Sequence, residues 1–154
     1  MTQQTETFEQ SQERDRKERA NHTAEALKKF REVFKLLGYK PIEPKENNNW
    51  NIQLLGINGR EMIWLSTGEY RDKGRIWVRG DYPRKHDIYP NNRAEISISF
   101  EKTPLQIGND ITRRFLPLYQ VQLNEVQEKI DARDSYNSEI EKVATEIKGK
   151  KLTE

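Results

Sequence analysis

The sequence contains no cysteine, only two histidines and few apolar residues. Without cysteine the chain can form no disulfide, thiolate nucleophile, iron–sulfur cluster or cysteine-based zinc site. Apolar residues make up 33% of the 154 residues and charged residues 34%, so the core is modest and much of the chain is solvated. The 27 basic and 25 acidic residues leave a net charge of +2, which excludes a strongly basic nucleic-acid condenser and an acidic DNA mimic.

Long apolar runs are also missing. No stretch approaches the roughly 18 apolar residues of a membrane span, and residues 1–19 lack the apolar segment of a secretory signal. We therefore expect a cytoplasmic protein that does not contact membranes. The phosphate-binding, nucleophile and zinc motifs of common enzyme classes do not occur. The sequence thus predicts a protein that is not an enzyme and that uses no cofactor and no metal.

Three segments differ in composition. Residues 1–19 are almost wholly polar and predict an extension that is either disordered or a solvated helix. Residues 20–147 predict a single α+β domain, and residues 148–154 a frayed tail. From Ala20 to Leu37 apolar residues recur at spacings of three and four, which predicts a helix that ends before Gly38.

The middle of the chain predicts an antiparallel β-meander of about four strands, after a connector over residues 39–49. The strands are expected at 50–57, 60–66, 75–80 and 94–102. Asn58-Gly59 is typical of a two-residue hairpin turn, which would pair Leu55 with Met62. Alternation places Leu54 and Ile63 on the core face of the sheet, and it places Leu55, Met62 and Trp64 on the opposite face.

A long C-terminal helix is predicted after the sheet. Thr103, Pro104 and Gln106 form a helix-start pattern, and apolar residues then recur with heptad spacing as far as Ile147. Pro117 predicts a kink near residues 113–115. The heptad pattern fits either a helix pair within the chain or a homodimer. The helices are expected to cover one face of the sheet.

Basic residues concentrate in residues 70–86, which hold six basic residues against two acidic ones. Alternation puts Arg75, Trp77 and Arg79 on one face of a strand. Arginine beside an exposed tryptophan is typical of single-stranded nucleic-acid binders and equally of protein interfaces. The null hypothesis, a solvated strand whose tryptophan packs under its own loop, stays open. The candidate binding residues are Trp64, Arg71, Lys73, Arg75, Trp77, Arg79, Arg84, Lys85, Arg113 and Arg114.

One segment carries a resemblance. The strand Glu95-Ile96-Ser97-Ile98-Ser99, followed by Ile107 to Tyr119 with its paired Arg113-Arg114 and Leu116-Pro117-Leu118-Tyr119, is similar to a pattern in small uncharacterised proteins of phages, plasmids and their bacterial hosts. It covers about a sixth of the chain by the span Ile96–Gln120. The resemblance implies a mobile-element origin and assigns no activity and no site.

These observations favour a small non-enzymatic binding module that acts through a protein partner, with a counter-defence or accessory role on a mobile element as the biological setting. Two alternatives stay open. One is binding of single-stranded or duplex nucleic acid through the Arg–Trp–Arg strand and the basic loop. The other is an enzyme that uses Asp81, His86 and Asp87 in the loop.

Overall fold

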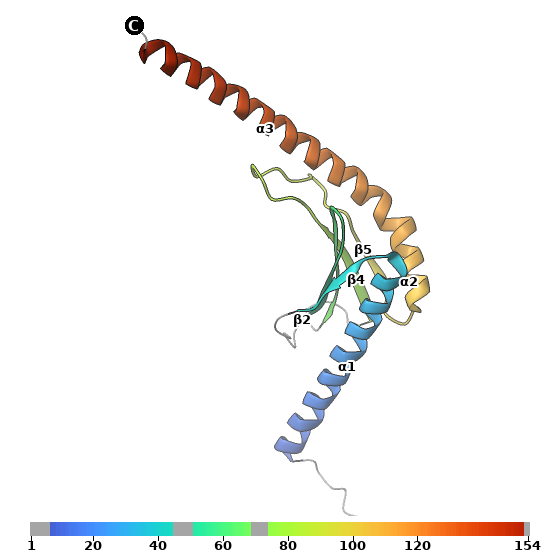
Figure 1. Cartoon of the computed structure of the whole chain (residues 1–154). Helices are drawn as coiled ribbons and strands as arrows, with labels where there is room; N and C mark the ends of the chain where they lie inside the picture. The colour runs from blue at the N-terminus through green and yellow to red at the C-terminus, as the bar shows by residue number, and fades with distance from the viewer. Residues whose placement is uncertain (1–6, 45–50, 69–73, 153–154) are drawn as a thin grey trace, which may run out of the picture.

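The computed structural model describes the backbone of residues 7–44, 51–68 and 74–152. A long helix precedes a five-stranded antiparallel sheet, and a second long helix follows it (Figure 1). The elements are α1 (Phe8–Leu37), β1 (Lys40–Ile42), β2 (Asn51–Asn58), β3 (Glu61–Gly68), β4 (Arg75–Asp81), β5 (Glu95–Ser99), α2 (Pro104–Asp110), the π-helix η1 (Ile111–Phe115) and α3 (Leu116–Leu152). The predicted α+β class and the meander are confirmed.

The sheet has one strand more than predicted. Strands lie in the order β1-β2-β3-β4-β5, and β1 falls inside the segment that the sequence predicted to be a connector. Lys40 pairs with Ile57 and Ile42 with Leu55, so the chain enters the sheet immediately after α1. Pro41 lacks an N–H donor, and an edge strand is the place in a sheet that tolerates it.

The β2–β3 turn lies one residue later than predicted. Ile57 pairs with Met62 and Leu55 with Trp64, so Gly59 and Arg60 form the turn and the predicted Leu55–Met62 pairing is wrong. Gly59 has φ +60°, whereas Arg60 is not among the residues with positive φ, which fits a type II′ turn. The partner of each residue moves by two positions, and therefore every side chain keeps its predicted face.

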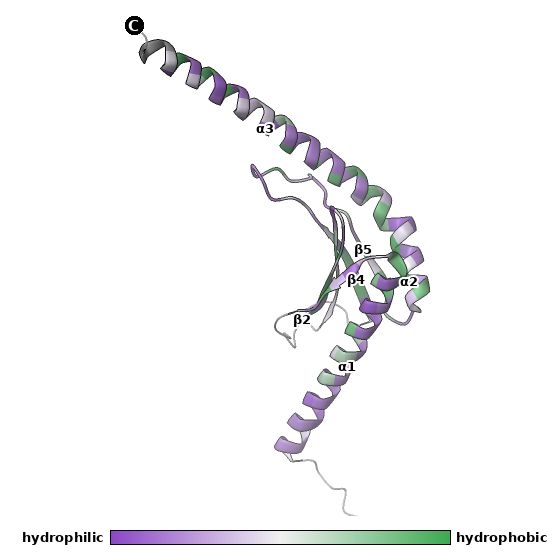
Figure 2. Cartoon of the chain, viewed as in Figure 1, coloured by the Kyte–Doolittle hydropathy of each residue, from purple (hydrophilic) through white to green (hydrophobic). Residues whose placement is uncertain are grey.

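α1 begins and ends with strong local signals. Thr7 and Gln10 form a capping box at the start, and Gly38 ends the helix in the left-handed conformation at φ +80°. Residues 8–19 belong to this helix and carry exposed, hydrophilic side chains apart from Phe8 and the half-buried Ser11 (Figure 2). This part of the polar extension is therefore a solvated helix.

The core lies between one face of the sheet and the helices. Fully buried side chains come from every layer: Phe30 and Phe34 from α1, Leu54, Ile63, Leu65 and Ile76 from the sheet, and Ile107, Ile111, Phe115 and Tyr119 from the C-terminal helices. Two glycines let aromatic rings approach the strands. A Cβ on Gly56 would overlap the Phe34 ring, and one on Gly80 would lie 2.8 Å from Tyr119 Cε2.

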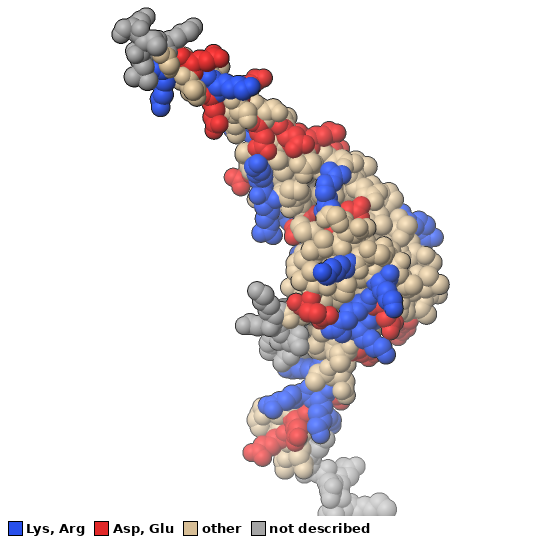
Figure 3. Space-filling view, in the orientation of Figure 1, with Lys and Arg blue, Asp and Glu red and all other residues tan. Residues whose placement is uncertain are grey.

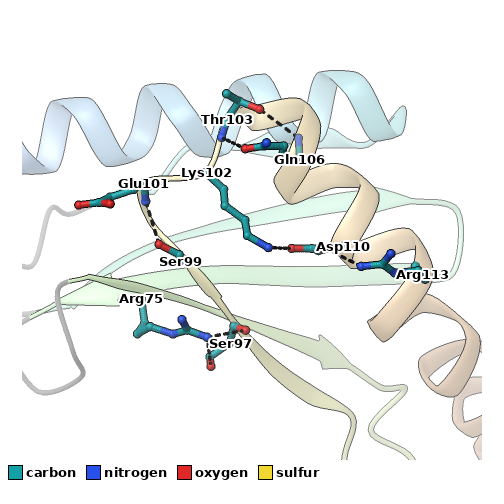
Figure 4. Close-up of polar contacts among 9 residues, drawn as sticks. All are labelled: Arg75, Ser97, Ser99, Glu101, Lys102, Thr103, Gln106, Asp110 and Arg113. Carbon is teal, nitrogen blue, oxygen red and sulfur yellow. Dashed lines mark hydrogen bonds and ion pairs between the residues drawn. The ribbon is translucent and has the colours of Figure 1, made fainter.

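The C-terminal helices form one rod with a local defect. Thr103 and Gln106 make the predicted capping box at the start of α2 (Figure 4). The predicted disturbance near residue 113 is the π-helix η1, in which the Leu116 N–H donates to the Ile111 carbonyl. Pro117 cannot donate to the residue one turn before it, and its ring crowds that turn. A wide π turn relieves both problems without ending the helix.

The second half of α3 extends away from the sheet (Figure 1). Tyr119, Leu123, Val126 and Ile130 are buried against the body, and no residue from 131 to 149 is buried. Tyr136, Ile140, Val143 and Ile147 are each about half exposed, at spacings of four, three and four residues. In this part of the helix Ile140 and Ile147 keep the heptad phase of the buried stripe, Tyr136 and Val143 lie one position away from it, and the four side chains form an apolar stripe that faces solvent.

Candidate interaction surfaces

The sheet has a second face that the helices do not cover in the part of the chain that the structure describes. α1, α2 and the first half of α3 lie on one side of the sheet (Figure 1). We call the opposite side the outer face. Cross-strand register assigns to it Lys40, Ile42, Gln53, Leu55, Ile57, Met62, Trp64, Ser66, Arg75, Trp77, Arg79, Asp81, Glu95, Ser97 and Ser99.

Two tryptophans form the centre of the outer face. Trp64 pairs with Arg79, and Trp77 pairs with Ser66 two residues along, so the two indoles are diagonal neighbours on adjacent strands. Trp64 continues a row with Leu55 and Ile42. Both tryptophans are half-buried. The predicted alternation of Arg75, Trp77 and Arg79 is present.

The two arginines beside Trp77 differ in their surroundings. Arg75 donates to the Ser97 carbonyl at 3.0 Å and to the Ser97 hydroxyl at 2.9 Å (Figure 4). The Phe100 N–H donates to the Gly74 carbonyl, so Phe100 is hydrogen-bonded to the residue just before β4. Because every second residue of an antiparallel strand directs its backbone groups to the same side, the Ser97 carbonyl points away from β4, toward the open edge of β5. The Arg75 side chain therefore satisfies a backbone carbonyl of the edge strand β5 that would otherwise be free to accept a hydrogen bond from another strand. Arg79 is exposed, with Glu95 as its cross-strand neighbour.

Charge on the outer face is nearly balanced. Lys40, Arg75 and Arg79 contribute three positive charges, and Asp81 and Glu95 contribute two negative ones. Elsewhere in the view of Figure 3, lysine and arginine are interspersed with aspartate and glutamate along α3. The four basic residues of segment 70–86 that the structure describes are divided between the outer face, which holds Arg75 and Arg79, and the β4–β5 loop, which holds Arg84 and Lys85.

The loop between β4 and β5 is fastened to α3 at two places. Gln122 is buried, accepts from the Tyr82 hydroxyl at 2.6 Å and from the Ala94 N–H at 3.0 Å, and donates to the Asn92 carbonyl. Further along, Asp134 pairs with Lys85 at 2.9 Å and with His86 Nε2 at 2.7 Å. These two partners, Lys85 first, hold the pKa of the Asp134 carboxyl below its usual range.

The candidate loop residues are thus separated by their partners. Lys85 binds α3, whereas the Arg84 side chain is 81% exposed and lies 3.9 Å from Asp81. His86 and Asp87 line a groove against α3, and Asp81 lines a different hollow with Arg84 and Tyr89. The trio Asp81, His86 and Asp87, which the enzyme hypothesis requires, is therefore divided between two hollows. Among the described residues no group of three or more potential metal ligands occurs.

Arg113 and Arg114 lie on η1, in the helical layer. Arg113 contacts the buried Asp110 at 3.2 Å, and Lys102 contacts the other oxygen of that carboxylate at 2.7 Å (Figure 4). Lys102 is the main cause of the lowered pKa of Asp110, and Arg113 and Arg114 add to it. Both arginines are exposed, but they are in a different layer from the outer face.

The predicted site therefore divides into three. Trp64, Arg75, Trp77 and Arg79 share the outer face, Arg84 and Lys85 lie on the loop, and Arg113 and Arg114 lie in the helical layer. Arg71 and Lys73 lie outside the described residues. Sequence reasoning missed Asp134 and Gln122, which pair with residues 28 to 49 positions away. Gln122 could have been found from the sequence, because it is a polar residue at a position of the helix that the apolar spacing predicts to be buried.

No protein-family model matches the chain, and searches of curated proteins and of solved structures find none that is significantly similar. None of the described helices is both long enough and apolar enough to cross a membrane. The function must therefore be argued from the surfaces themselves.

Proposed function

We propose that this chain is a small protein-binding module that contacts its partner through the outer face of the sheet. The observation that carries the proposal is the diagonal pair Trp64–Trp77, flanked by Leu55, Met62 and Arg79 on a face that the described helices leave open. Tryptophan and arginine supply most of the binding energy at protein interfaces, where they form a compact centre within a polar rim.

The polar residues of the outer face fit such a rim. Gln53, Ser66 and Ser97 lie in the row of Trp77, and Asp81 and Glu95 lie at the end of the sheet near Arg79. The half-buried state of the tryptophans lowers the entropy lost on binding, because neighbours already restrict their rotamers. Arg75 occupies the Ser97 carbonyl at the edge of β5, which favours contact through side chains over addition of a strand.

The charge balance favours a protein partner over nucleic acid. A protein that follows a phosphate backbone needs several cations on one surface, and the described residues of the outer face include three cations against two carboxylates. The remaining candidate cations that the structure describes lie on the loop or in the helical layer. Nucleic-acid binding by the Arg79–Trp64 neighbours is the alternative outcome of the test below.

The exposed stripe of α3 supports a second mode of association. Tyr136, Ile140, Val143 and Ile147 have the spacing of a coiled-coil seam, which favours pairing of two copies along this helix. Ile140→Asp would then convert a dimer to a monomer in sedimentation analysis, and a chain that is monomeric before the substitution would contradict the pairing. A mobile-element origin, with a host protein as partner, is the setting that the Ile96–Gln120 resemblance suggests.

The test compares variants of the outer face with matched controls. Tagged wild-type chain is used to isolate a partner from the native host, and the partner is then purified and titrated against each variant. Trp64→Ser and Arg79→Glu are expected to weaken binding about tenfold or more, as hot-spot substitutions do. Leu118→Ser removes an apolar side chain that is more exposed than Trp64 from α3, and Lys142→Glu reverses a charge there; both are expected to bind like wild type.

Three results would overturn the proposal. Equal binding by the Trp64 and Arg79 variants would remove the outer face from the interface. Loss of binding by the α3 controls alone would assign the contact to the helix. Binding of labelled single-stranded or duplex DNA or RNA that weakens steeply with salt would favour the nucleic-acid alternative. Circular dichroism of each variant confirms that the fold is retained.

A further inference from the structure

A groove lies between the β4–β5 loop and α3, away from the outer face. His86, Asp87 and Ile88 form its loop side, and Lys129, Ala132, Arg133 and Tyr136 form its helix side. The helix residues lie on one side of α3 because they are spaced by three and four positions. The groove is separate from the outer face, since no outer-face residue lines it, but it shares Tyr136 with the exposed stripe of α3.

Positive charge converges in the groove. Lys129 and Arg133 are one helical turn apart, and His86 faces them from the loop. The Arg133 guanidinium lies 5.9 Å from the centre of the Tyr136 ring, a cation–π contact that restricts its orientation. Asp87 is the one carboxylate in the lining.

Asp134, a carboxylate that contacts the groove residue His86, is already paired with basic side chains. Its two oxygens pair with Lys85 at 2.9 Å and with His86 Nε2 at 2.7 Å. An anion in the groove therefore meets little repulsion from this side chain. The same contact fixes the position of the His86 ring at the loop side of the groove.

The loop adopts an unusual backbone to place these groups. His86 and Asp87 have φ of 59° and 53°, and they are the described non-glycine residues with positive φ. Residues other than glycine rarely adopt this backbone conformation, so tertiary contacts must stabilise it. The pairing of Lys85 and His86 with Asp134 supplies such contacts, and strain of this kind concentrates at binding sites.

We propose that the loop–helix groove binds the phosphate group of a small organic phosphate. Arg133 offers a planar fork of N–H donors that matches two phosphate oxygens, and Lys129 adds a point charge one turn away. His86 lies opposite these two side chains, on the loop side of the groove. Tyr136 and Ile88 provide an apolar wall for the organic part of the ligand.

The experiment is a titration of the full chain followed by amide NMR at constant ionic strength. Inorganic phosphate and adenosine monophosphate are the probes, up to about 10 mM, a range that detects millimolar dissociation constants. We expect both probes to shift the resonances of residues 86–88 and 129–136. Tighter binding of the nucleotide would mean that the organic part contacts the apolar wall, and equal binding would mean that the phosphate alone is recognised.

Variants separate a built site from general charge attraction. Arg133→Gln and Lys129→Gln are each expected to weaken binding about fivefold, by loss of one charged hydrogen bond. Asp87→Asn is expected to tighten binding about twofold to threefold, because a like charge is removed. Lys142→Gln removes the same charge from an exposed position of α3 outside the groove and is expected to change nothing.

The proposal fails if neither probe shifts these resonances. It also fails if Lys142→Gln weakens binding as much as Arg133→Gln, since the attraction would then depend on net charge. The outer-face variants Trp64→Ser and Arg79→Glu should bind phosphate like wild type. Failure of the groove therefore leaves the protein-binding proposal intact, and the reverse holds as well.

Discussion

Tyr119 joins the C-terminal helix to the end of the sheet, and removal of its hydroxyl is the most direct test of the packing. The side chain is fully buried, and its ring fills the space above Gly80. The hydroxyl accepts from the Met62 N–H at 3.0 Å and donates to the Asp81 carbonyl at 2.7 Å. Tyr119→Phe keeps the ring and leaves these two backbone groups without that partner. Each unsatisfied buried group costs about 1–3 kcal/mol, so we expect a loss of about 2 kcal/mol when partial rehydration is allowed for.

The same burial makes the contribution of Tyr119 to folding stability depend on pH in the alkaline range. Burial raises the pKa of the Tyr119 phenol to about 12 from about 10 in the unfolded chain. Between these values the unfolded chain releases the proton and the folded chain keeps it, so the folded state loses stability as the pH rises. Two pKa units correspond to about 2.7 kcal/mol, which is fully present below pH 10 or so and lost through pH 12 or so.

Urea unfolding of wild type and Tyr119→Phe at a series of pH values measures both effects. At neutral pH the variant should unfold about 2 kcal/mol more easily, which corresponds to a melting temperature about 4–8 °C lower for a chain of this size. At alkaline pH the two stability curves should converge, because only wild type carries the ionisable group. Tyr136→Phe, on the exposed part of α3, should match wild type throughout. A Tyr119 variant within about 0.5 kcal/mol of wild type, or parallel curves above pH 10 or so, would refute the reasoning.

Three further substitutions test other contacts. Gly80→Ala places a methyl group against the Tyr119 ring and should cost about 1–3 kcal/mol in urea unfolding, whereas Gly149→Ala, which meets open space, should cost nothing; equal effects would contradict the packing. Asp110→Asn should destabilise by about 2 kcal/mol near neutral pH. The pKa of Asp110 is lower in the folded chain than in the unfolded chain, so this carboxylate stabilises the fold at pH values above its unfolded pKa. The difference in stability between wild type and Asp110→Asn should therefore vanish as the solution is acidified below the folded pKa. Asp134→Asn should free the loop from α3 and speed amide exchange at residues 85–88 with little change in global stability; unchanged exchange would show that Gln122 alone holds the loop.

Local patterns in the sequence predicted the elements whose causes are local. The three-and-four spacing and Gly38 identified the Ala20–Leu37 part of α1, which begins twelve residues earlier at Phe8, and Thr103 with Gln106 identified the start of α2. β1 was missed because three residues that include a proline carry no alternation, and the strand exists only because α1 delivers the chain alongside β2. The hairpin turn was misplaced by one residue because Asn58-Gly59 and Gly59-Arg60 both satisfy the need for positive φ at a glycine, and the choice depends on pairing along the whole hairpin.

The candidate site shows the same division between local and long-range causes. Alternation correctly placed Trp64, Arg75, Trp77 and Arg79 on one face, because strand geometry alone decides that placement. The positive excess of residues 70–86 does not by itself indicate where the charge lies, because charge counted along the chain ignores the partners that folding supplies. Arg75 donates a hydrogen bond to Ser97, and Lys85 pairs with Asp134, which lies 49 positions further along the chain. What remains on the outer face is a tryptophan pair with nearly balanced charge, and this residue set argues for recognition of a protein surface over capture of a polyanion.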